Sequence, residues 1–206
     1  MRKIIIFTFI VFINSFCFGK VETKNLIKTG FDFEGNFKQE SNFQGYKKEQ
    51  ISNSLSVSYE RLENIYKFIY LGLGAEYQAS RSIKNTNIEF NYIPIYIILR
   101  SNIFENSKKE LRVFLVAKTG FSFLDGIRNI KVEKDYQAEL GETARLSYQG
   151  KLYRSFGGGI GYKNIEIEFL YSENDGDIYL GSDNLVGNIK MKSNYSKFSL
   201  YLGFCF

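Results

Sequence analysis

The sequence predicts an all-β protein, an eight-stranded antiparallel up-and-down β-barrel that crosses a membrane on its strands. Three observations support this fold class. The chain ends on a segment in which apolar residues alternate with small or polar ones, similar segments recur along the chain, and long connections alternate with short ones. A period of two places successive side chains on opposite faces of a strand.

The first 19 residues predict a secretory signal peptide. Arg2 and Lys3 precede an apolar run over 4–13, and a cleavage region ending at the small Gly19 follows. The run is shorter than the roughly 20 apolar residues that a membrane-spanning helix requires. An uncleaved N-terminal anchor is the alternative. We therefore expect residues 20–206 to form a single exported barrel domain.

Composition argues against several kinds of chemistry. The chain has no histidine, so it lacks the commonest general base and metal ligand and the partner that activates serine or cysteine nucleophiles. We expect no catalytic residue, no metal site and no cofactor, and hence no enzyme. The net charge of +5 falls to about +3 without Arg2 and Lys3, and it is dispersed, so nucleic acid is not an expected partner.

Four strands are expected in the first half of the exported chain, over 26–37, 51–62, 66–77 and 88–100. In the first three, one parity is apolar and the other is polar or glycine-rich. The fourth is apolar on both parities, so its facing stays open.

Four more strands are expected over 111–123, 148–162, 165–172 and 195–206. The sixth is rich in glycine, and the run Gly157-Gly158-Gly159-Ile160-Gly161 is followed by a strand pattern rather than by the helix of a phosphate-binding loop. Those glycines therefore predict strand curvature and room for large inward neighbours. The last strand carries Phe198, Leu200, Leu202, Phe204 and Phe206 on one parity.

The connections are sorted by length. The stretches 38–50, 78–87, 124–146 and 173–191 are long, whereas those around 63–64, 102–109 and 163–164 are short. A membrane barrel with both ends in the periplasm has long external loops and short periplasmic turns, and a soluble sandwich has no reason for such sorting. Residues Asn174 to Asp177 lack the later glutamate of a calcium loop and predict a turn.

The apolar faces could point inward, as in a soluble ligand carrier, or outward to lipid. Strand lengths near the ~9–11 residues that cross a bilayer, the export signal and the C-terminal aromatic favour the outward solution. Seven charged residues then share the inward parity: Glu60, Glu76, Arg112, Lys118, Glu166, Glu168 and Lys197.

An eight-stranded barrel is just wide enough for side chains to fill its interior. Buried charges must be paired, so these seven residues predict an ion-pair network that plugs the barrel, with a narrow ion path as the alternative. Glu166 and Glu168 lie on one face and could serve acid–base chemistry, but without a cleft an ion-pair role is favoured. The mixed charges of 127–145 are compatible with adhesion, with contact to lipopolysaccharide, or with a simple solvated loop.

The signal segment, Tyr92-Ile-Pro-Ile-Tyr96, the stretch 154–162 and the stretch 198–206 together carry a family resemblance. The chain resembles the small eight-stranded outer-membrane β-barrels, which include the transmembrane domain of OmpA and the OmpX-like proteins. The resemblance covers essentially the whole exported chain. It implies a monomer in the bacterial outer membrane, reached through the periplasm, whose last strand, with Phe198, Leu200, Leu202, Phe204 and Phe206, is read by the barrel-assembly machinery.

The function expected from these observations is non-enzymatic. The protein would stabilise the membrane or interact, like an adhesin, through its extracellular loops, with outer-membrane lipid, lipopolysaccharide and host surface molecules as partners. A narrow porin-like channel is the first alternative and a secreted soluble ligand-carrying barrel the second. Fold alone does not decide among these roles.

Overall fold

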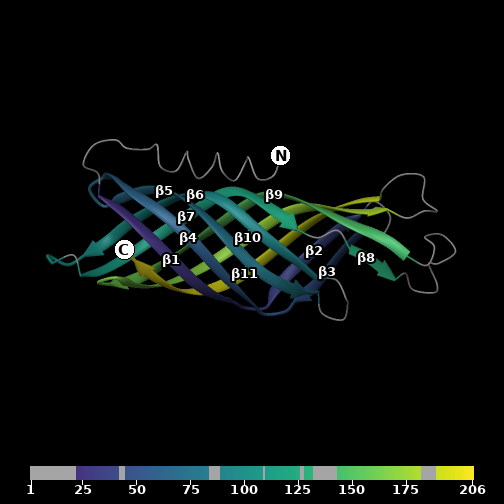
Figure 1. The fold of residues 1–206 in the computed structure, drawn as a ribbon, viewed down its shortest axis with the longest axis horizontal. Coiled ribbons are helices and arrows are strands. Elements are labelled where there is room, and N and C mark those ends of the chain that lie inside the picture. Colours follow the sequence, from purple (N-terminus) through teal and green to yellow (C-terminus); the bar gives the residue numbers. More distant parts are fainter. Residues whose placement is uncertain are drawn as a thin grey trace.

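The computed structural model describes residues 22–41, 45–83, 89–108, 110–125, 128–131, 143–181 and 189–206. The predicted signal peptide, 1–19, lies outside these residues. The described chain forms an elongated barrel of tilted strands (Figure 1). Across the described ranges, no helix has the length and apolar character needed to cross a membrane.

Eight strands close into a ring, and each pairs antiparallel with its neighbour. In ring order they are β1 (Thr23–Asp32), β4 (Ser54–Tyr66), β5 (Ile69–Ser82), β6 (Glu89–Glu105), β7 (Leu111–Asp125), β9 (Thr143–Tyr162), β10 (Ile165–Gly181) and β11 (Ile189–Cys205). Pairing of β1 with β11, with Ile27 opposite Phe204, completes the ring. The predicted fold class is confirmed, and closure leaves no open sheet edge within the ring.

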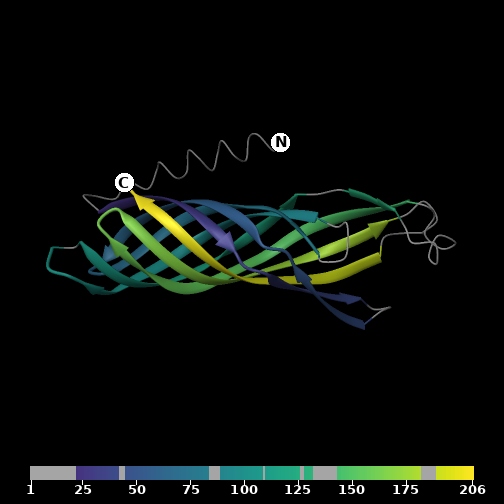
Figure 2. The same cartoon turned by 90° about the horizontal axis from the view of Figure 1, so that it is seen from below.

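Three short strands supplement the ring: β2 (Gly35–Ser41), β3 (Gly45–Ile51) and β8 (Arg128–Lys131). The prediction of one strand over 26–37 followed by a loop is wrong here. The chain leaves β1 after Asp32, and β2 then pairs with β11 while β3 folds back on β2. This β2–β3 hairpin diverges from the barrel wall (Figure 2).

Several strands also run further into the predicted loops than expected. Strands β10 and β11 pair as far as Leu180 opposite Ile189, within the predicted loop 173–191. The turn predicted at Asn174 to Asp177 is wrong, because these residues lie inside β10 beside a register shift against β9. Beyond the lipid, a strand needs no apolar outer face, so its sequence there resembles a loop.

The sorting of connections is confirmed. Short hairpins join β4 to β5 and β9 to β10, and their residues Lys67 and Lys163 adopt left-handed backbone conformations with φ of 44° and 52°. The C-terminus lies at this end of the barrel, and the strand ends that the longer connections join lie at the other (Figure 1). We call these the turn end and the loop end.

The apolar side chains face outward. Leu55, Leu71, Phe169 and Leu200 are 62%, 43%, 49% and 43% exposed, although they are large and apolar. Together with their exposed apolar neighbours they form the apolar belt, which is far larger than the patches found on soluble monomers. The alternative of a soluble carrier with an apolar interior is therefore wrong.

The facing of β6, left open by its sequence, is settled. Ile97 and Leu99 are exposed, whereas Tyr96, Ile98 and Arg100 are buried in the interior. Apolar residues on both parities arise because the interior holds apolar side chains as well as charges.

The glycines of β9 leave space for neighbours, as predicted. A Cβ atom added to Gly159 would lie 2.6 Å from the ring of Phe114 and 2.2 Å from the carbonyl oxygen of Ile167. One added to Gly157 would lie 2.0 Å from the carbonyl oxygen of Phe169. Larger residues at either position would force the strands apart.

Candidate functional site in the barrel interior

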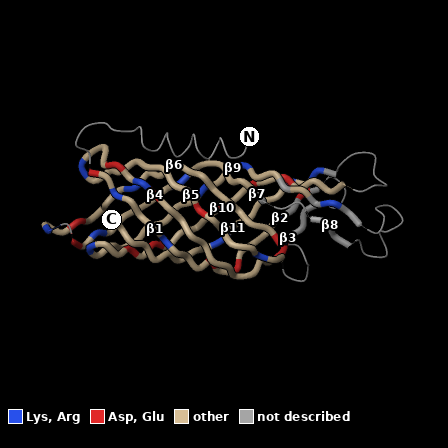
Figure 3. Tube along the Cα trace, in the orientation of Figure 1, with Lys and Arg blue, Asp and Glu red and all other residues tan. Residues whose placement is uncertain are grey.

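The structure places all seven predicted lumen charges inside the barrel. Glu60, Glu76, Arg112, Lys118, Glu166, Glu168 and Lys197 are each 6% exposed or less. They come from β4, β5, β7, β10 and β11, so strands distant in sequence contribute to one interior. Acidic and basic positions occur along the whole length of the barrel (Figure 3).

Three of the seven predicted charges, together with Lys28 of β1, form a closed ring of alternating sign, which we call the central ion-pair ring. Lys28 Nζ lies 2.6 Å from both Glu60 Oε2 and Glu168 Oε2. Lys118 Nζ lies 2.7 Å from Glu60 Oε1 and 2.9 Å from Glu168 Oε1. In the order of the eight strands, β1 and β7 lie opposite each other, so Lys28 and Lys118 approach from opposite walls. The ring therefore spans the bore.

A second cluster lies nearer the turn end. Arg100 donates two hydrogen bonds to Glu166, of 2.7 and 2.8 Å, in the paired geometry that makes such contacts strong. Arg112 adds a third contact to Glu166 at 3.2 Å. The Arg100 guanidinium also lies 3.6 Å from the centre of the Phe114 ring, a cation–π contact.

A third cluster lies toward the loop end around Asp32. Lys197 Nζ and Arg81 Nη2 each lie 2.7 Å from Asp32 Oδ2. Lys197 also lies 3.4 Å from Glu76, which accepts a 2.8 Å hydrogen bond from the Tyr201 hydroxyl. Each charge in this cluster therefore has a partner of opposite sign.

Apolar side chains fill the space around these clusters. One buried group contains Leu26, Leu62, Tyr70, Tyr96, Ile98, Val116, Tyr153, Leu170 and Tyr201. A second, at the loop end, contains Phe37, Ile51, Ile83, Phe90, Tyr92, Ile178 and Tyr195. We call the second group the loop-end apolar cap. Charged and apolar side chains together occupy the interior.

The sequence-based set missed Lys28, Asp32, Arg81 and Arg100. Lys28 and Asp32 share the polar parity of the first strand, so that alternation could have identified them. Arg81 lies beyond the predicted end of its strand, 66–77. Arg100 is the last residue of the predicted strand 88–100, whose inward and outward faces the sequence left undecided. Only the folded barrel shows which charges oppose one another.

Ion pairs occupy both carboxylates of the Glu166 and Glu168 pair. Glu166 and Glu168 both accept contacts from basic side chains on other strands, so neither carboxylate is available as the acid–base pair considered above. Within the described part of the chain, no group of three or more His, Cys, Asp or Glu residues could hold a metal ion. What these contacts can do is neutralise buried charge and fix the strands relative to one another.

The proposed assembly residues lie together on the outside of β11. Phe198, Leu200, Leu202, Phe204 and Phe206 are 43–57% exposed. Phe206 is held at the closing seam by main-chain hydrogen bonds of 2.9 and 3.2 Å with Asn25 of β1. Their role in assembly stays a prediction.

A closed ring of eight strands, apolar outside and ion-paired inside, defines a small membrane-spanning β-barrel of the bacterial outer-membrane type. Solved structures agree with this class. The outer-membrane protein OprG from Pseudomonas aeruginosa is 11% identical, with 91% of this chain and 98% of that chain covered and a TM-score of 0.53. Outer-membrane protein AlkL in lipid bilayers is 12% identical, with 92% and 93% covered and the same TM-score of 0.53.

Neisserial surface protein A aligns more weakly, with 14% identity, 91% and 100% covered and a TM-score of 0.48. No protein-family model and no curated protein sequence matches the chain. At these identities the likeness concerns the fold. The predicted resemblance to small outer-membrane barrels is confirmed at that level, and with the apolar belt it agrees with a location in a bacterial outer membrane.

Proposed function

We propose that the protein is a non-conducting, non-enzymatic outer-membrane barrel that stabilises the membrane and presents its loop end to the surroundings. The observation that supports this most strongly is the filled interior. The central ion-pair ring, the two flanking charge clusters and the loop-end apolar cap follow one another along the bore.

Ion passage would have to break these contacts. A buried ion pair that loses one partner leaves an uncompensated charge, which costs about 3–5 kcal/mol. An ion moving along the bore would then meet the loop-end apolar cap, where Phe37, Tyr92 and Tyr195 are each 1% exposed or less. The alternative of a narrow channel is therefore less well supported than the plug.

The proposed role at the surface rests on the sorting of the connections. The strand ends that the long connections join lie at the loop end, which faces outward in an outer-membrane barrel. The stretches 132–142 and 182–188, which would carry the contacts, lie outside the described residues. Absence of histidine and the pairing of the buried carboxylates support a role without catalysis.

Planar-bilayer recording of the refolded exported chain, residues 20–206, tests whether the filled interior blocks ion flow. We expect no steady unit conductance, and the Lys163→Asn variant, altered outside the lumen, should behave identically. Steady channels whose ion selectivity changes in the Glu166→Gln variant would contradict the proposal and support the narrow channel instead.

A further inference from the structure

A cleft of about 390 Å³ lies at the loop end between four strands. It is lined by Lys38 and Glu40 of β2, Lys151 of β9, Asp175, Gly176 and Asp177 of β10, and Lys192, Ser193 and Asn194 of β11. The register shift between Asn174 and Gly176 lies at this place, and Gly176 has no side chain to fill the space. The hairpin that the sequence did not predict thus supplies one wall.

An aromatic row of the apolar belt lies on the same strands, toward the turn end. Phe156, Tyr171, Phe198 and Phe169 are in contact, with successive ring centroids 5.4, 5.1 and 5.6 Å apart. On β10, Glu173 and Asp175 follow Tyr171, and Arg154 lies opposite Glu173 across the β9–β10 pair. Outward residues therefore change from aromatic to charged within two positions.

The cleft lies beyond the aromatic row, toward the loop end. From Tyr171 to Asp175 or Asp177 the strand advances four to six residues, at ~3.3 Å each and a tilt of ~45°, so the cleft lies roughly 9–14 Å beyond the aromatic row. That distance corresponds to the polar region of a bilayer and the sugars above it.

Two of the three acidic residues that line the cleft, Asp175 and Asp177, already have cationic or amide partners, whereas Glu40 lies opposite Lys192 and forms no ion pair with another described residue. Asp177 lies 2.8 Å from Lys151 Nζ and 2.9 Å from Lys190 Nζ. Asp175 accepts a 2.7 Å hydrogen bond from Asn194 and lies 3.5 Å from Arg154. These contacts neutralise the two carboxylates.

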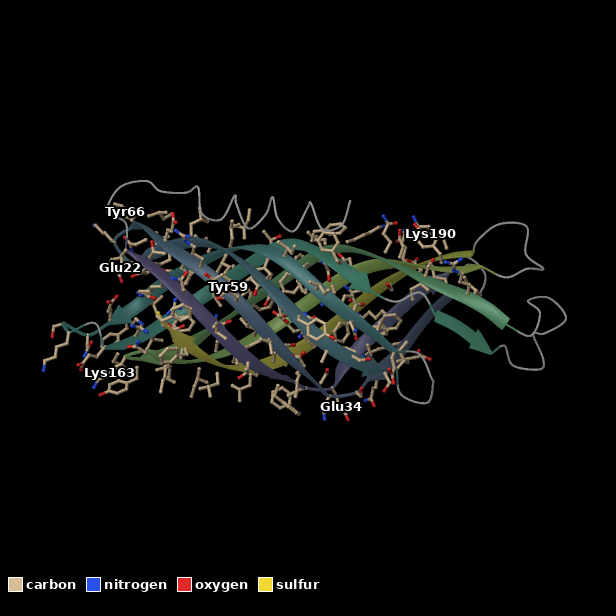
Figure 4. All side chains as sticks on the ribbon, in the orientation of Figure 1. Glu22, Glu34, Tyr59, Tyr66, Lys163 and Lys190 are labelled. Atoms are coloured by element: carbon tan, nitrogen blue, oxygen red, sulfur yellow. The ribbon has the colours of Figure 1, made fainter. Side chains whose placement is uncertain are left out.

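Two lysines of the cleft keep their charge available. Lys38 and Lys192 are exposed, and neither forms an ion pair with another described residue. Lys38 lies opposite Asn194, and Lys192 lies opposite Glu40, across the β2–β11 pair. Lys190, which holds Asp177, projects from the same end (Figure 4). The site thus offers ammonium groups on the loop side of a surface suited to acyl chains.

We propose that this cleft binds the phosphate groups of an outer-leaflet glycolipid, whose acyl chains lie along the aromatic row. Lys38 and Lys192 donate hydrogen bonds to the phosphate oxygens. Lys151 and Lys190 lie beside the bound phosphate, at the Asp177 side of the cleft. The inference rests on the membrane placement of the proposed function and deepens it, because it names the lipid that the barrel would hold.

The test uses the full exported chain refolded in detergent and phosphatidylcholine vesicles that contain either diphosphoryl lipid A or its dephosphorylated form. We expect tighter binding to the phosphorylated vesicles, with a preference that declines as salt rises. The double variant Lys38→Gln with Lys192→Gln should lose roughly tenfold or more in affinity for them, since each basic residue near an anionic surface contributes several-fold.

A charge-matched control removes two lysines at the turn end, Lys108→Gln with Lys163→Asn, where asparagine tolerates the left-handed backbone of residue 163. This control should keep the wild-type preference, and folding of every variant is checked by its heat-dependent gel mobility. Unchanged affinity in the cleft variant would overturn the proposal.

Equal binding of inorganic phosphate without vesicles, or a preference for a sulfated polysaccharide over lipid A, would also overturn the lipid assignment. No preference for phosphorylated vesicles, together with no conductance in planar bilayers, would refute the cleft site but not the proposed plugged barrel. Open channels would instead refute the proposed function, whatever the lipid result.

Discussion

Lys118 shows how a charge can be stable in the middle of this barrel. Its ammonium group contacts Glu60 and Glu168, and it lies 5.3 Å and 5.6 Å from the ring centres of Tyr96 and Tyr201. The residue is 3% exposed, so water cannot replace these partners. Its stability depends on the pairing rather than on solvation.

We expect the Lys118→Met variant to lose about 3–5 kcal/mol of unfolding free energy, because Glu60 and Glu168 would share one remaining lysine. Urea unfolding in lipid vesicles measures this. Lys190→Met is the matched control, since the Lys190 side chain is 51% exposed, and it should cost below about 1 kcal/mol. A loss for Lys118→Met no larger than that of the control would show that the ring does not stabilise the barrel.

The contribution of Asp177 to the stability of the folded state should depend on pH. Burial opposes ionisation of this carboxyl, but hydrogen bonds from Lys151 and Lys190 outweigh it and lower its pKa below the ordinary value of 3.8. A lowered pKa stabilises the folded state above the ordinary pKa, and the contribution disappears as the pH falls through the folded-state pKa.

The Asp177→Asn variant should therefore be less stable than the wild type by about 1 kcal/mol near neutral pH, and the difference should shrink below about pH 4. Parallel unfolding curves between pH 3 and 7 measure the difference. Glu40→Gln removes the same charge from a residue that forms no ion pair within the described ranges, so its effect should be smaller. A difference that grows on acidification would refute the sign of this argument.

Besides the backbone pairing of β2 with β11, one inward side chain per strand anchors the β2–β3 hairpin. Phe37 of β2 is 1% exposed, with its ring centre 5.3 Å from that of Phe90 on β6. Ile51 of β3 is fully buried and forms an isolated bridge with Ile83 at the end of β5. Both belong to the loop-end apolar cap, so the hairpin and the cap depend on each other.

Replacing Phe37 with alanine should loosen the hairpin, since removing a buried aromatic ring costs about 3–5 kcal/mol. Local opening would expose the hairpin backbone to protease. We expect faster trypsin cleavage at Lys38, Lys47 or Lys48, measured by mass spectrometry of the folded protein in detergent. Phe33→Ala, whose ring is 41% exposed, is the control and should leave the cleavage rate unchanged. Equal rates in the two variants would contradict the role of Phe37.

At the scale of the whole molecule, the sequence predicted the features that lipid imposes. Period-two alternation exists because one face meets hydrocarbon, and it predicted the facing of residues such as Leu55 and Phe169, whereas the strand over 88–100 is apolar on both parities and its facing stayed open. The parity of the seven lumen residues follows from the same alternation. The sorting of connections follows from the two sides of the membrane.

Features beyond the reach of lipid could not be predicted in this way. Above the apolar belt, β10 carries Glu173 and Asp175 outward while Ile178 faces a buried apolar cluster, so alternation no longer separates strand from loop. The pairing of Arg81 with Asp32 joins β5 to β1 past the intervening strand β4, which no local pattern records. The cleft depends likewise on β2 lying beside β11.

The orientation of the whole barrel gives a further prediction. A peptide tag inserted after Asp183, in the long connection from β10 to β11, should bind antibody on intact cells, because long connections face outward. The same tag after Ser107, in the short connection from β6 to β7, should be reached only after the outer membrane is permeabilised. Staining of Ser107 insertions on intact cells would reverse the assigned orientation.

The central ion-pair ring also constrains how the barrel can close. Its members come from β1, β4, β7 and β10, and a one-residue slip in any of these strands would turn that strand's charge toward the acyl chains. A barrel with the wrong register would then have one charged side chain facing the lipid and one unpaired charge in its interior. The native register of these four strands therefore brings all four charges into the bore together.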